Sequence, residues 1–447
     1  MLDVTDRRSR QSAARLEARP RHGAGAARFL DRFFPLAVPL RRVIRQGDLT
    51  IVDAAGTAHQ FGRPGDTPRA AIRLHDRALS WTLLADTDLR FGEAYMDGRI
   101  TIEEGSLRDF LEIIASNATG ARMTPWAAGN GQGAPATAAA AAALLLLKRF
   151  AQQHNPLARS RSNVAHHYDL SDTLYDLFLD DDRQYSCAYF ANPADTLEAA
   201  QRNKQRHIAA KLLLTRPGMR VLDIGSGWGG LAIYLAKATG ADVTGLTLSA
   251  EQHRCASQRA LAEGLADRVR FHLRDYREEQ GTYDRIVSVG MFEHVGAPQY
   301  GAFFATLKER LRPDGVALLH SIGRMDGPGT TNSWVRKYIF PGGYAPALSE
   351  VLPHVERTGL WATDIETLRL HYAETLKEWH RRFEINRRRI AQLYDERFCR
   401  MWELYLLGSE MQFRYCNMMV FQMQLARDVG TAPLTRDYMV DCERRLA

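Results

Sequence analysis

The sequence predicts an α/β protein with a doubly wound, mainly parallel sheet, preceded by a smaller α+β domain. Residues 221–230, VLDIGSGWGG, read as a buried strand that enters a glycine turn. Residues 231–240 then follow a helical pattern ended by glycine, and residues 241–249 read as a second strand, which completes a βαβ unit. Apolar runs at 269–276 and 283–289 supply two more strands. In such a sheet, ligands bind at the carboxyl ends of the strands.

The beginning of the chain is strongly basic. Residues 1–50 contain eleven arginines and five acidic residues, a net charge of +6, whereas the whole chain carries +7. Such an arm can bind nucleic acid or an anionic membrane face, or it can be a solvated tail. Residues 1–25 are predicted to be a disordered basic tail. The apolar segment 29–40 is predicted to join the core of the next domain, with an interfacial anchor as the alternative.

The pattern before the main sheet predicts a small domain of strands and helices. Residues 41–62 alternate apolar and polar positions between glycines, which predicts hairpins, and residues 70–100 mix strand and helix patterns. Residues 107–116 read as an amphipathic helix capped by Ser106. The predicted order is the basic tail at 1–25, the N-terminal domain at 26–117, a linker and an alanine/leucine helix at 118–155, and the main domain at 156–447.

Composition narrows the class of protein. Of 447 residues, 45% are hydrophobic, which is enough for a large core. The five cysteines form no C-x-x-C pair, so neither a disulfide framework nor a zinc cluster is expected, and no metal site is predicted. The first 28 residues lack an apolar signal-peptide core. The longest apolar run, residues 138–147, is about half the ~20 residues that span a bilayer. A soluble, cytoplasmic protein is therefore predicted.

The glycine turn alone does not identify its ligand, because dinucleotide enzymes and methyltransferases both use such turns. A dinucleotide site usually has an acidic residue at the end of the second strand to hold the ribose. Here that strand ends in residues 246–249, LTLS. Asp275 and Tyr276, at the end of the third strand, could provide an acceptor for an adenine amino group and an aromatic wall. S-adenosylmethionine therefore fits this pattern better than NAD does.

Several longer motifs occur in a fixed order between about residues 160 and 430. With these motifs the chain resembles the cyclopropane fatty acid synthases and the related mycolic acid cyclopropane synthases, which depend on S-adenosylmethionine. The motifs are HYDLSDTLYDLFLD (167–180), YSCAYF (185–190), VLDIGSGWGG (221–230), GLTLSAEQ (245–252), DRIVSVGMFEHVG (284–296), HSIG (320–323), KYIFPGGYAP (337–346), HYAETLKEW (371–379) and GSEMQFR (408–414).

The resemblance implies a Rossmann-like class I methyltransferase fold that transfers a methylene group to the cis double bond of unsaturated phospholipid acyl chains. It also implies that the N-terminal domain engages lipid at the inner face of the membrane, and it allows a homodimer. The cofactor residues that it implies are Tyr185, Ser186, Gly225, Gly227, Gly229, Thr247, Leu248, Gln252, Asp275, Tyr276 and Arg277. Some relatives have Trp-Glu in place of Tyr276–Arg277.

The implied chemistry needs a base near the new methyl group. An isolated alkene is a weak nucleophile, so the donor must be held in line with it in a dry pocket, and ring closure then requires loss of a proton. In the resembling family the base is thought to be bound bicarbonate. The residues implied to hold it are Cys187, Glu293, His320, Ile322 and Tyr372.

Residue chemistry suits this assignment. Glu293 can accept the O–H of bicarbonate while His320 and Tyr372 donate to its oxygens. Glu293 follows the fourth strand, and His320 is expected to end the next strand, 316–319, so both side chains reach one edge of the sheet. Ser409 is a further candidate catalytic residue, at a position where many relatives have cysteine. A serine there argues against an obligatory thiol.

The C-terminal half is expected to supply the lipid pocket. Residues 330–346 read as a loop that carries Trp334, Tyr338 and Phe340 and covers an acyl chain. Residues 376–389 and 397–425 follow long helical patterns whose aromatic residues line the pocket in part.

Three alternative functions remain open at this point. A fatty-acid methyltransferase would share the first step and lose a different proton, which gives a methyl-branched or methylene chain. A nucleic-acid methyltransferase is supported only by the basic arm, and Asn192–Pro193–Ala194 does not match the N-P-P-[YF] motif, so no nucleic-acid partner is predicted. The third alternative is a noncatalytic lipid-binding module.

Overall fold

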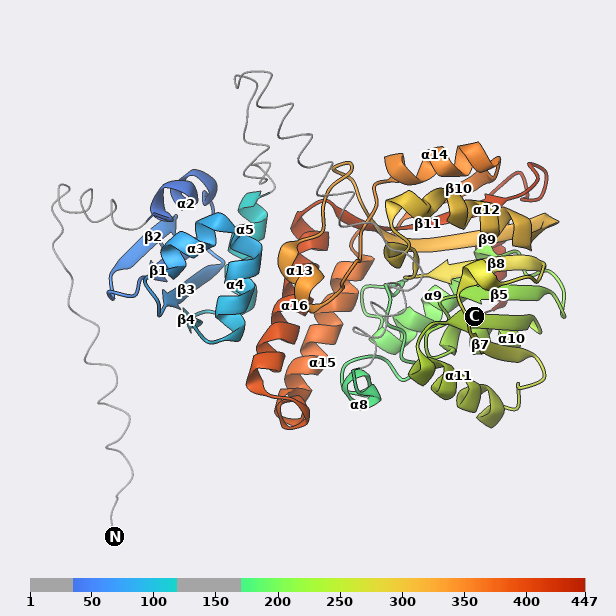
Figure 1. Ribbon diagram of the computed structural model, residues 1–447, viewed down its shortest axis with the longest axis horizontal. Helices are drawn as coiled ribbons and strands as arrows, with labels where there is room; N and C mark the ends of the chain where they lie inside the picture. Colours follow the sequence, from blue (N-terminus) through green and yellow to red (C-terminus); the bar gives the residue numbers. More distant parts are fainter. Residues whose placement is uncertain (1–34, 119–169, 447) are drawn as a thin grey trace, which may run out of the picture.

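The computed structural model describes residues 35–118 and 170–446 (Figure 1). The predicted basic tail, the first half of the apolar segment 29–40 and the predicted linker helix lie outside the described residues. Figure 1 shows a small blue unit on one side and the large sheet on the other. Helices α13 (Ser333–Tyr338), α15 (His371–Leu393) and α16 (Glu396–Tyr415) lie between them.

The N-terminal unit is the predicted α+β portion. Its four-stranded sheet has the order β2-β1-β3-β4. Strands β1 and β2 form the predicted antiparallel hairpin, and the Ser106 hydroxyl accepts the Asp109 N–H at the start of α5, also as predicted. The elements are α2 (Ala37–Val43), β1 (Asp48–Val52), β2 (Ala58–Gly62), β3 (Arg69–Leu74), α3 (Leu79–Ala85), α4 (Thr87–Met96), β4 (Ile100–Glu104) and α5 (Leu107–Ala118).

The main sheet confirms the doubly wound prediction. Its seven strands have the order β10-β11-β9-β8-β5-β6-β7, and the five strands from β9 to β7 run parallel. One buried cluster packs α12 (Tyr300–Arg310) and α14 (Leu348–Thr358) on the strands, and another packs α9 (Leu197–Lys211), α10 (Gly230–Thr239) and α11 (Ala250–Ala262). The strands are β5 (Arg220–Ile224), β6 (Asp242–Thr247), β7 (Val269–Leu273), β8 (Tyr283–Val289), β9 (Leu311–Arg324), β10 (Trp361–Thr367) and β11 (Met418–Ala426).

The remaining elements connect and cover these strands. No helix in the described ranges is long and apolar enough to cross a membrane. The α-helices are α8 (Asp172–Asp176), α9 (Leu197–Lys211), α10 (Gly230–Thr239), α11 (Ala250–Ala262), α12 (Tyr300–Arg310), α14 (Leu348–Thr358) and α17 (Asp437–Arg445). The 3-10 turns are η1 (Tyr276–Glu278), η2 (Phe292–His294) and η3 (Ala297–Gln299).

The predicted helical pattern of residues 397–425 is wrong in its last part. Helix α16 ends at Tyr415, and residues Met418–Ala426 form β11, which lies antiparallel between β9 and β10. All positions of β11 except the first are buried. A strand covered on both faces has a continuous apolar sequence, which periodicity cannot distinguish from a buried helix.

Two local predictions around the site also need correction. Strand β9 continues to Arg324, so His320 lies inside the strand and not at its end; its partner on β11 is Gln422. The segment 330–346 contains helix α13, because the Asn332 side chain caps the N–H groups of Trp334 and Val335.

Trp334 packs on the N-terminal unit, contrary to the predicted role as an acyl-chain cover. Its side chain is buried, and its Nε1 lies 3.2 Å from the Met96 sulfur on α4. A Cβ at Gly92 would stand 2.2 Å from the Trp334 ring, so only glycine admits the indole there. The nearby Phe340 ring lies 5.8 Å from that of Tyr405 on α16.

Polar contacts also join the N-terminal unit to α16. Arg108 of α5 donates two hydrogen bonds to the fully buried Glu410, at 2.8 and 2.6 Å. The Tyr95 hydroxyl donates to Glu403 at 2.9 Å. One apolar cluster contains residues of both units, so they share a core.

Candidate active site

The glycine turn after β5 borders a cavity of about 1180 Å³, a volume that includes its opening to solvent. Gly225 (φ 86°) and Gly227 (φ 54°) adopt left-handed backbone conformations that other residues rarely adopt. A Cβ at Gly225 would also stand 2.8 Å from the Met291 Cβ. Helix α10 begins beyond the turn without a capping side chain, so its first N–H groups can bind a polar ligand.

All the predicted cofactor residues except Gly229 line this cavity. Gly229 caps α10, and a Cβ there would stand 2.6 Å from Phe271 and 2.9 Å from Ala256, so it allows close packing of the helix. The predicted residues that line the cavity are Tyr185, Ser186, Gly225, Gly227, Thr247, Leu248, Gln252, Asp275, Tyr276 and Arg277.

Polar side chains of α9 hold one wall of the cavity. The Gln201 amide donates to the carbonyls of Gln184 and Ser186 at 3.1 and 3.0 Å. The buried Lys204 ammonium donates to Gln184 Oε1 at 2.6 Å and to the Ser186 hydroxyl at 2.9 Å. These bonds fix the segment that carries Tyr185.

Asp223 and Lys204 are site residues that the sequence analysis missed. Asp223 lines the cavity, and its buried Oδ2 has no hydrogen-bond partner among the described residues. Burial raises the pKa of Asp223 to about 7, against the effect of Lys204. Burial also lowers the pKa of Lys204 to about 8. An unpaired carboxylate oxygen here suits an ammonium group, such as that of a methionine moiety.

The predicted adenine residues, Asp275 and Tyr276, also line the cavity. The Asp275 carboxylate accepts bonds from Arg277 Nε at 2.8 Å and Nη2 at 2.7 Å. The Arg277 guanidinium lies 5.5 Å from the centre of the Tyr276 ring. Thr247 donates to Gln252 Oε1 at 2.9 Å, and both are buried. The acceptor expected for an adenine amino group is therefore already paired with a guanidinium.

Glu293 lies beside the cavity on η2, between the lining residues Met291 and His294. It is 9% exposed, and its Oε1 accepts the Ile322 N–H at 2.6 Å. Its Oε2 is buried and has no partner in the described part of the chain. Burial raises the pKa of Glu293 to about 7, although the backbone N–H groups of Ile322 and of Glu293 itself counteract this.

His320 lies on β9, two residues before Ile322, whose N–H binds Glu293. Its carbonyl accepts the Gly290 N–H at 3.0 Å, and Gly290 lines the cavity. Its Nδ1 lies 3.1 Å from Gln422 Nε2. Burial, together with Lys204 and Lys211, lowers the pKa of His320 to about 3. The imidazole is therefore neutral at physiological pH.

Tyr372 approaches from α15 through aromatic contacts. Its ring lies 5.8 Å from Trp379, whose ring lies 5.1 Å from that of the cavity residue Tyr185. The hydroxyls of Tyr185 and Tyr405 lie 2.8 Å apart. Ser409 is half-buried one turn after Tyr405 on α16.

Cys187 directly follows the cavity residue Ser186 and is buried. Its thiol donates to the Ala188 carbonyl at 3.3 Å, and burial raises its pKa. A thiol in this state is a poor nucleophile. In the described structure, none of the six catalytic candidates lines the cavity itself. Cys187 and Glu293 adjoin lining residues in the chain, His320 is bonded to the lining residue Gly290, and Ile322 contacts Glu293.

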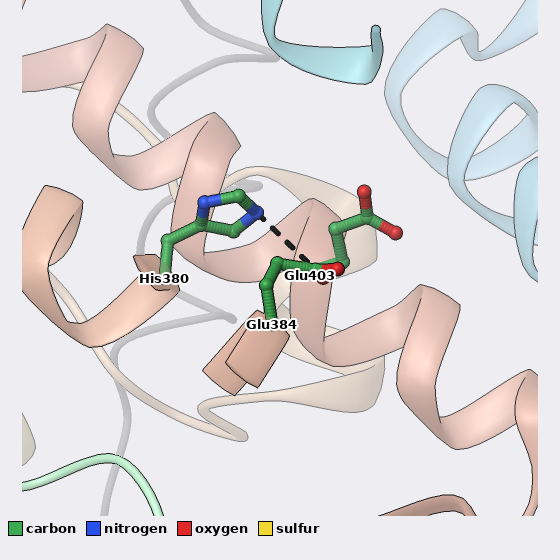
Figure 2. A group of neighbouring side chains, drawn as sticks. All are labelled: His380, Glu384 and Glu403. Atoms are coloured by element: carbon green, nitrogen blue, oxygen red, sulfur yellow. Dashed lines mark ion pairs between the residues drawn. The ribbon is translucent and has the colours of Figure 1, made fainter. Parts of the chain in front are cut away.

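One side-chain cluster in the described ranges has the spacing of metal ligands. Figure 2 shows His380 and Glu384 of α15 in an ion pair, with Glu403 of α16 beside them, and their ligand atoms lie within 4.8 Å of one another. Arg387 donates to Glu384 at 2.9 Å and to Glu403 at 2.8 Å, and Tyr95 also donates to Glu403. Arg387 thus pairs with both carboxylates, and Glu403 is also part of the contact with the N-terminal unit.

Two curated proteins are similar to the chain. The cyclopropane-fatty-acyl-phospholipid synthase of Escherichia coli (strain K12) is 43% identical over 263 residues, which cover 59% of this chain and 67% of that protein. The tuberculostearic acid methyltransferase UfaA1 of Mycobacterium tuberculosis is also 43% identical, over 283 residues, which cover 60% of this chain and 66% of that protein. The chain therefore spans about two thirds of the length of these relatives.

A solved structure and two family models agree with these matches. The mycolic acid cyclopropane synthase CmaA1, complexed with SAH and CTAB, is 33% identical with a TM-score of 0.57, over 61% of this chain and 99% of that chain. The large unit thus has the class I methyltransferase fold that was predicted. Residues 46–123 match a domain of unknown function. Residues 155–423 match the model named mycolic acid cyclopropane synthetase. As the motifs predicted, the chain belongs to the mycolic acid cyclopropane synthetase family.

Proposed function

We propose that the protein uses S-adenosylmethionine to add a methylene bridge across the cis double bond of unsaturated phospholipid acyl chains. The cofactor supplies an activated methyl group on a positively charged sulfur. The cavity residues suit it: Asp223 offers an acceptor for the ammonium, the α10 N-terminus offers donors for the carboxylate, and Tyr276 offers a face for adenine. The aromatic rings of Tyr185 and Trp228 can stabilise the sulfonium.

The second part of the proposal is that bound bicarbonate serves as the base. Glu293 accepts its O–H, and His320 and Tyr372 donate to its oxygens, with Cys187 and Ile322 completing the wall. The observation that carries this proposal is the buried Glu293 Oε2, which lacks a partner while Oε1 is held by Ile322. A buried carboxylate oxygen calls for a donor, and the bicarbonate O–H is one.

A fatty-acid methyltransferase is the second candidate function. The tuberculostearic acid methyltransferase UfaA1 is 43% identical to the chain, as is the E. coli cyclopropane synthase. The same buried residues would then receive a different proton from the carbocation. The product would be a methyl-branched or methylene chain.

The test is product analysis with the full chain. S-adenosylmethionine labelled with ¹³C in its methyl group is incubated with vesicles of cis-unsaturated phospholipid, with and without bicarbonate. The expected product shows the label as a cyclopropane CH₂ in NMR spectra, and depletion of bicarbonate slows its formation. Label in a branch methyl or an exocyclic methylene would establish the methyltransferase alternative. Label that never reaches the lipid would overturn both functions.

The proposal includes peripheral membrane contact, and homodimer formation, through the N-terminal unit. Helix α3 exposes Trp81 (68%) and Leu84 (47%), and α2 of the same unit exposes Val38. The end of α2 carries Arg41 and Arg42, whose charge favours an anionic surface.

Replacing Trp81 and Leu84 together with serine is expected to weaken binding to anionic vesicles more than about tenfold, since each side chain loses apolar burial in the interface. Binding of S-adenosylmethionine should be unchanged, because neither residue lines the cavity. Trp361→Ser is the matched control: Trp361 is 54% exposed, but it lies on β10 of the other unit. Equal loss of vesicle binding in the control would contradict a contact made by α3. Vesicle co-sedimentation measures the membrane binding of the double variant and of the control.

A further inference from the structure

A side chain of the adjacent strand β11 contacts the imidazole of His320. Gln422 of β11 pairs with His320 of β9 in the sheet register, and its Nε2 lies 3.1 Å from His320 Nδ1. The other end of the same amide, Oε1, accepts the Lys211 ammonium of α9 at 2.8 Å. All three side chains are buried.

The direction of these bonds is fixed by chemistry. An ammonium can only donate hydrogen bonds, so the Gln422 oxygen must face Lys211. The amide NH₂ of Gln422 therefore faces His320, and it too can only donate. His320 Nδ1 must then accept, and an acceptor nitrogen carries no proton. In a neutral imidazole the proton is therefore on Nε2.

Lys211, which is bonded to the oxygen of the Gln422 amide, also lies next to other charged side chains. Lys211 also donates to Glu366 of β10, and His207 places its two ring nitrogens 2.7 Å from Glu366 and 2.5 Å from Glu443. Because both His207 nitrogens face carboxylates, both must donate, and the ring is a cation. Burial alone would lower the pKa of His207, but its bonds to Glu366 and Glu443 raise it. The Glu366 carboxylate thus accepts hydrogen bonds from both Lys211 and His207.

We propose that Gln422 is a positioning residue, which fixes the Nε2-protonated tautomer of His320 and so makes His320 a hydrogen-bond donor in the active site. The proposal rests on the proposed function in one respect, namely that His320 donates to an anion. The opposite tautomer would place the Nδ1 proton against the amide hydrogens of Gln422. The low pKa of His320 agrees with a neutral ring that acts through one N–H. Gln422 itself touches no reacting group.

The first measurement uses the unmodified protein. NMR spectra of the full chain labelled with ¹⁵N-histidine distinguish the two neutral tautomers and the imidazolium, and the spectrum of a His320→Asn variant identifies the His320 signals. The expected spectrum shows His320 protonated on Nε2 alone at neutral pH. A Nδ1-protonated ring or an imidazolium overturns the proposal. This readout does not depend on lipid turnover, so a failure of the proposed function would be seen separately.

The second measurement compares two glutamines of the same strand. Gln422→Met keeps the side-chain length and removes both polar atoms. It should give a mixture of His320 tautomers and lower kcat about a hundredfold, the usual effect of losing one well-placed donor. KM for S-adenosylmethionine should stay within about twofold, since no part of the cofactor cavity changes.

Gln424→Met is the matched control. Gln424 is also buried, lies two residues further along β11, and donates to the Lys211 carbonyl and to the Tyr438 hydroxyl. It makes no contact with His320, so this variant should keep the single tautomer and most of kcat. If Gln422→Met keeps one Nε2-protonated tautomer and full kcat, or if both variants lose kcat equally, Gln422 does not position His320.

Discussion

Glu293→Gln is expected to lower the rate of lipid modification about a thousandfold, the typical contribution of a positioned acid–base group. The glutamine keeps an oxygen for the Ile322 N–H, so the local backbone has no reason to move. It replaces the second oxygen by an NH₂ group, which cannot accept the bicarbonate O–H. Binding of S-adenosylmethionine should be retained, because Glu293 does not line the cofactor cavity. Product formation and cofactor titration together check this result.

Relative to the wild type, the Glu293→Gln variant is expected to become more stable as the pH rises. Burial raises the pKa of Glu293 from 4.5 to about 7, so the folded state holds this proton more tightly than the unfolded chain does. Its contribution to stability is therefore present at low pH and is lost as the pH rises from about 5 to 8. This loss is on the order of 2–3 kcal/mol in the wild type and absent in the glutamine variant.

Urea unfolding of both proteins at the two pH values measures this difference. Asp223 and Lys204 also have shifted pKa values, but they are common to both proteins and cancel in the comparison. Glu309→Gln removes an exposed carboxylate on α12 and should leave the pH dependence of the wild type. A glutamine variant at 293 that follows the wild-type pH dependence would show that Glu293 is not a desolvated carboxylate. In that case Glu293 would not impose a trade-off between stability at neutral pH and catalysis.

The lining of the cavity could be predicted from sequence because its signals are local. Gly225 and Gly227 need left-handed backbone within one short turn, and the strand before them and helix after them are continuous in the chain. Asp275 and Tyr276 likewise come shortly after a strand, in their case β7. A residue at the carboxyl end of a parallel strand reaches this edge of the sheet whatever the rest of the chain does.

The parts that could not be predicted depend on contacts between distant segments. Residues Met418–Ala426 become a strand only because β9 and β10 cover their two edges. Lys204 is one polar residue in a helix of mostly polar residues, and only the tertiary structure shows that it is buried against Ser186. Trp334 lies in the segment 330–346, just before a family motif, yet its neighbour is Gly92, far away in the chain. Periodicity within a segment contains no information about such partners.

Arg108→Met is expected to destabilise the protein by about 3 kcal/mol, since it removes a bidentate partner from a carboxylate that is fully buried. Arg414 still donates to Glu410 at 3.0 Å, which keeps the loss below that of an isolated buried charge. Adding Glu410→Met should restore much of the stability, because the buried charge is then gone. Urea unfolding of the two single variants and the double variant measures the coupling.

A second ion pair between the same two units provides the control. Arg397 of α16 donates to Asp97, which follows α4, at 2.8 Å, but these side chains are 47% and 41% exposed. Because exposed pairs contribute about 0–1 kcal/mol, Arg397→Met should have little effect. If the two arginine variants lose equal stability, burial of Glu410 is not what makes the Arg108 contact strong. If only Arg108→Met destabilises, the buried Glu410 of α16 is a main attachment point of the N-terminal unit.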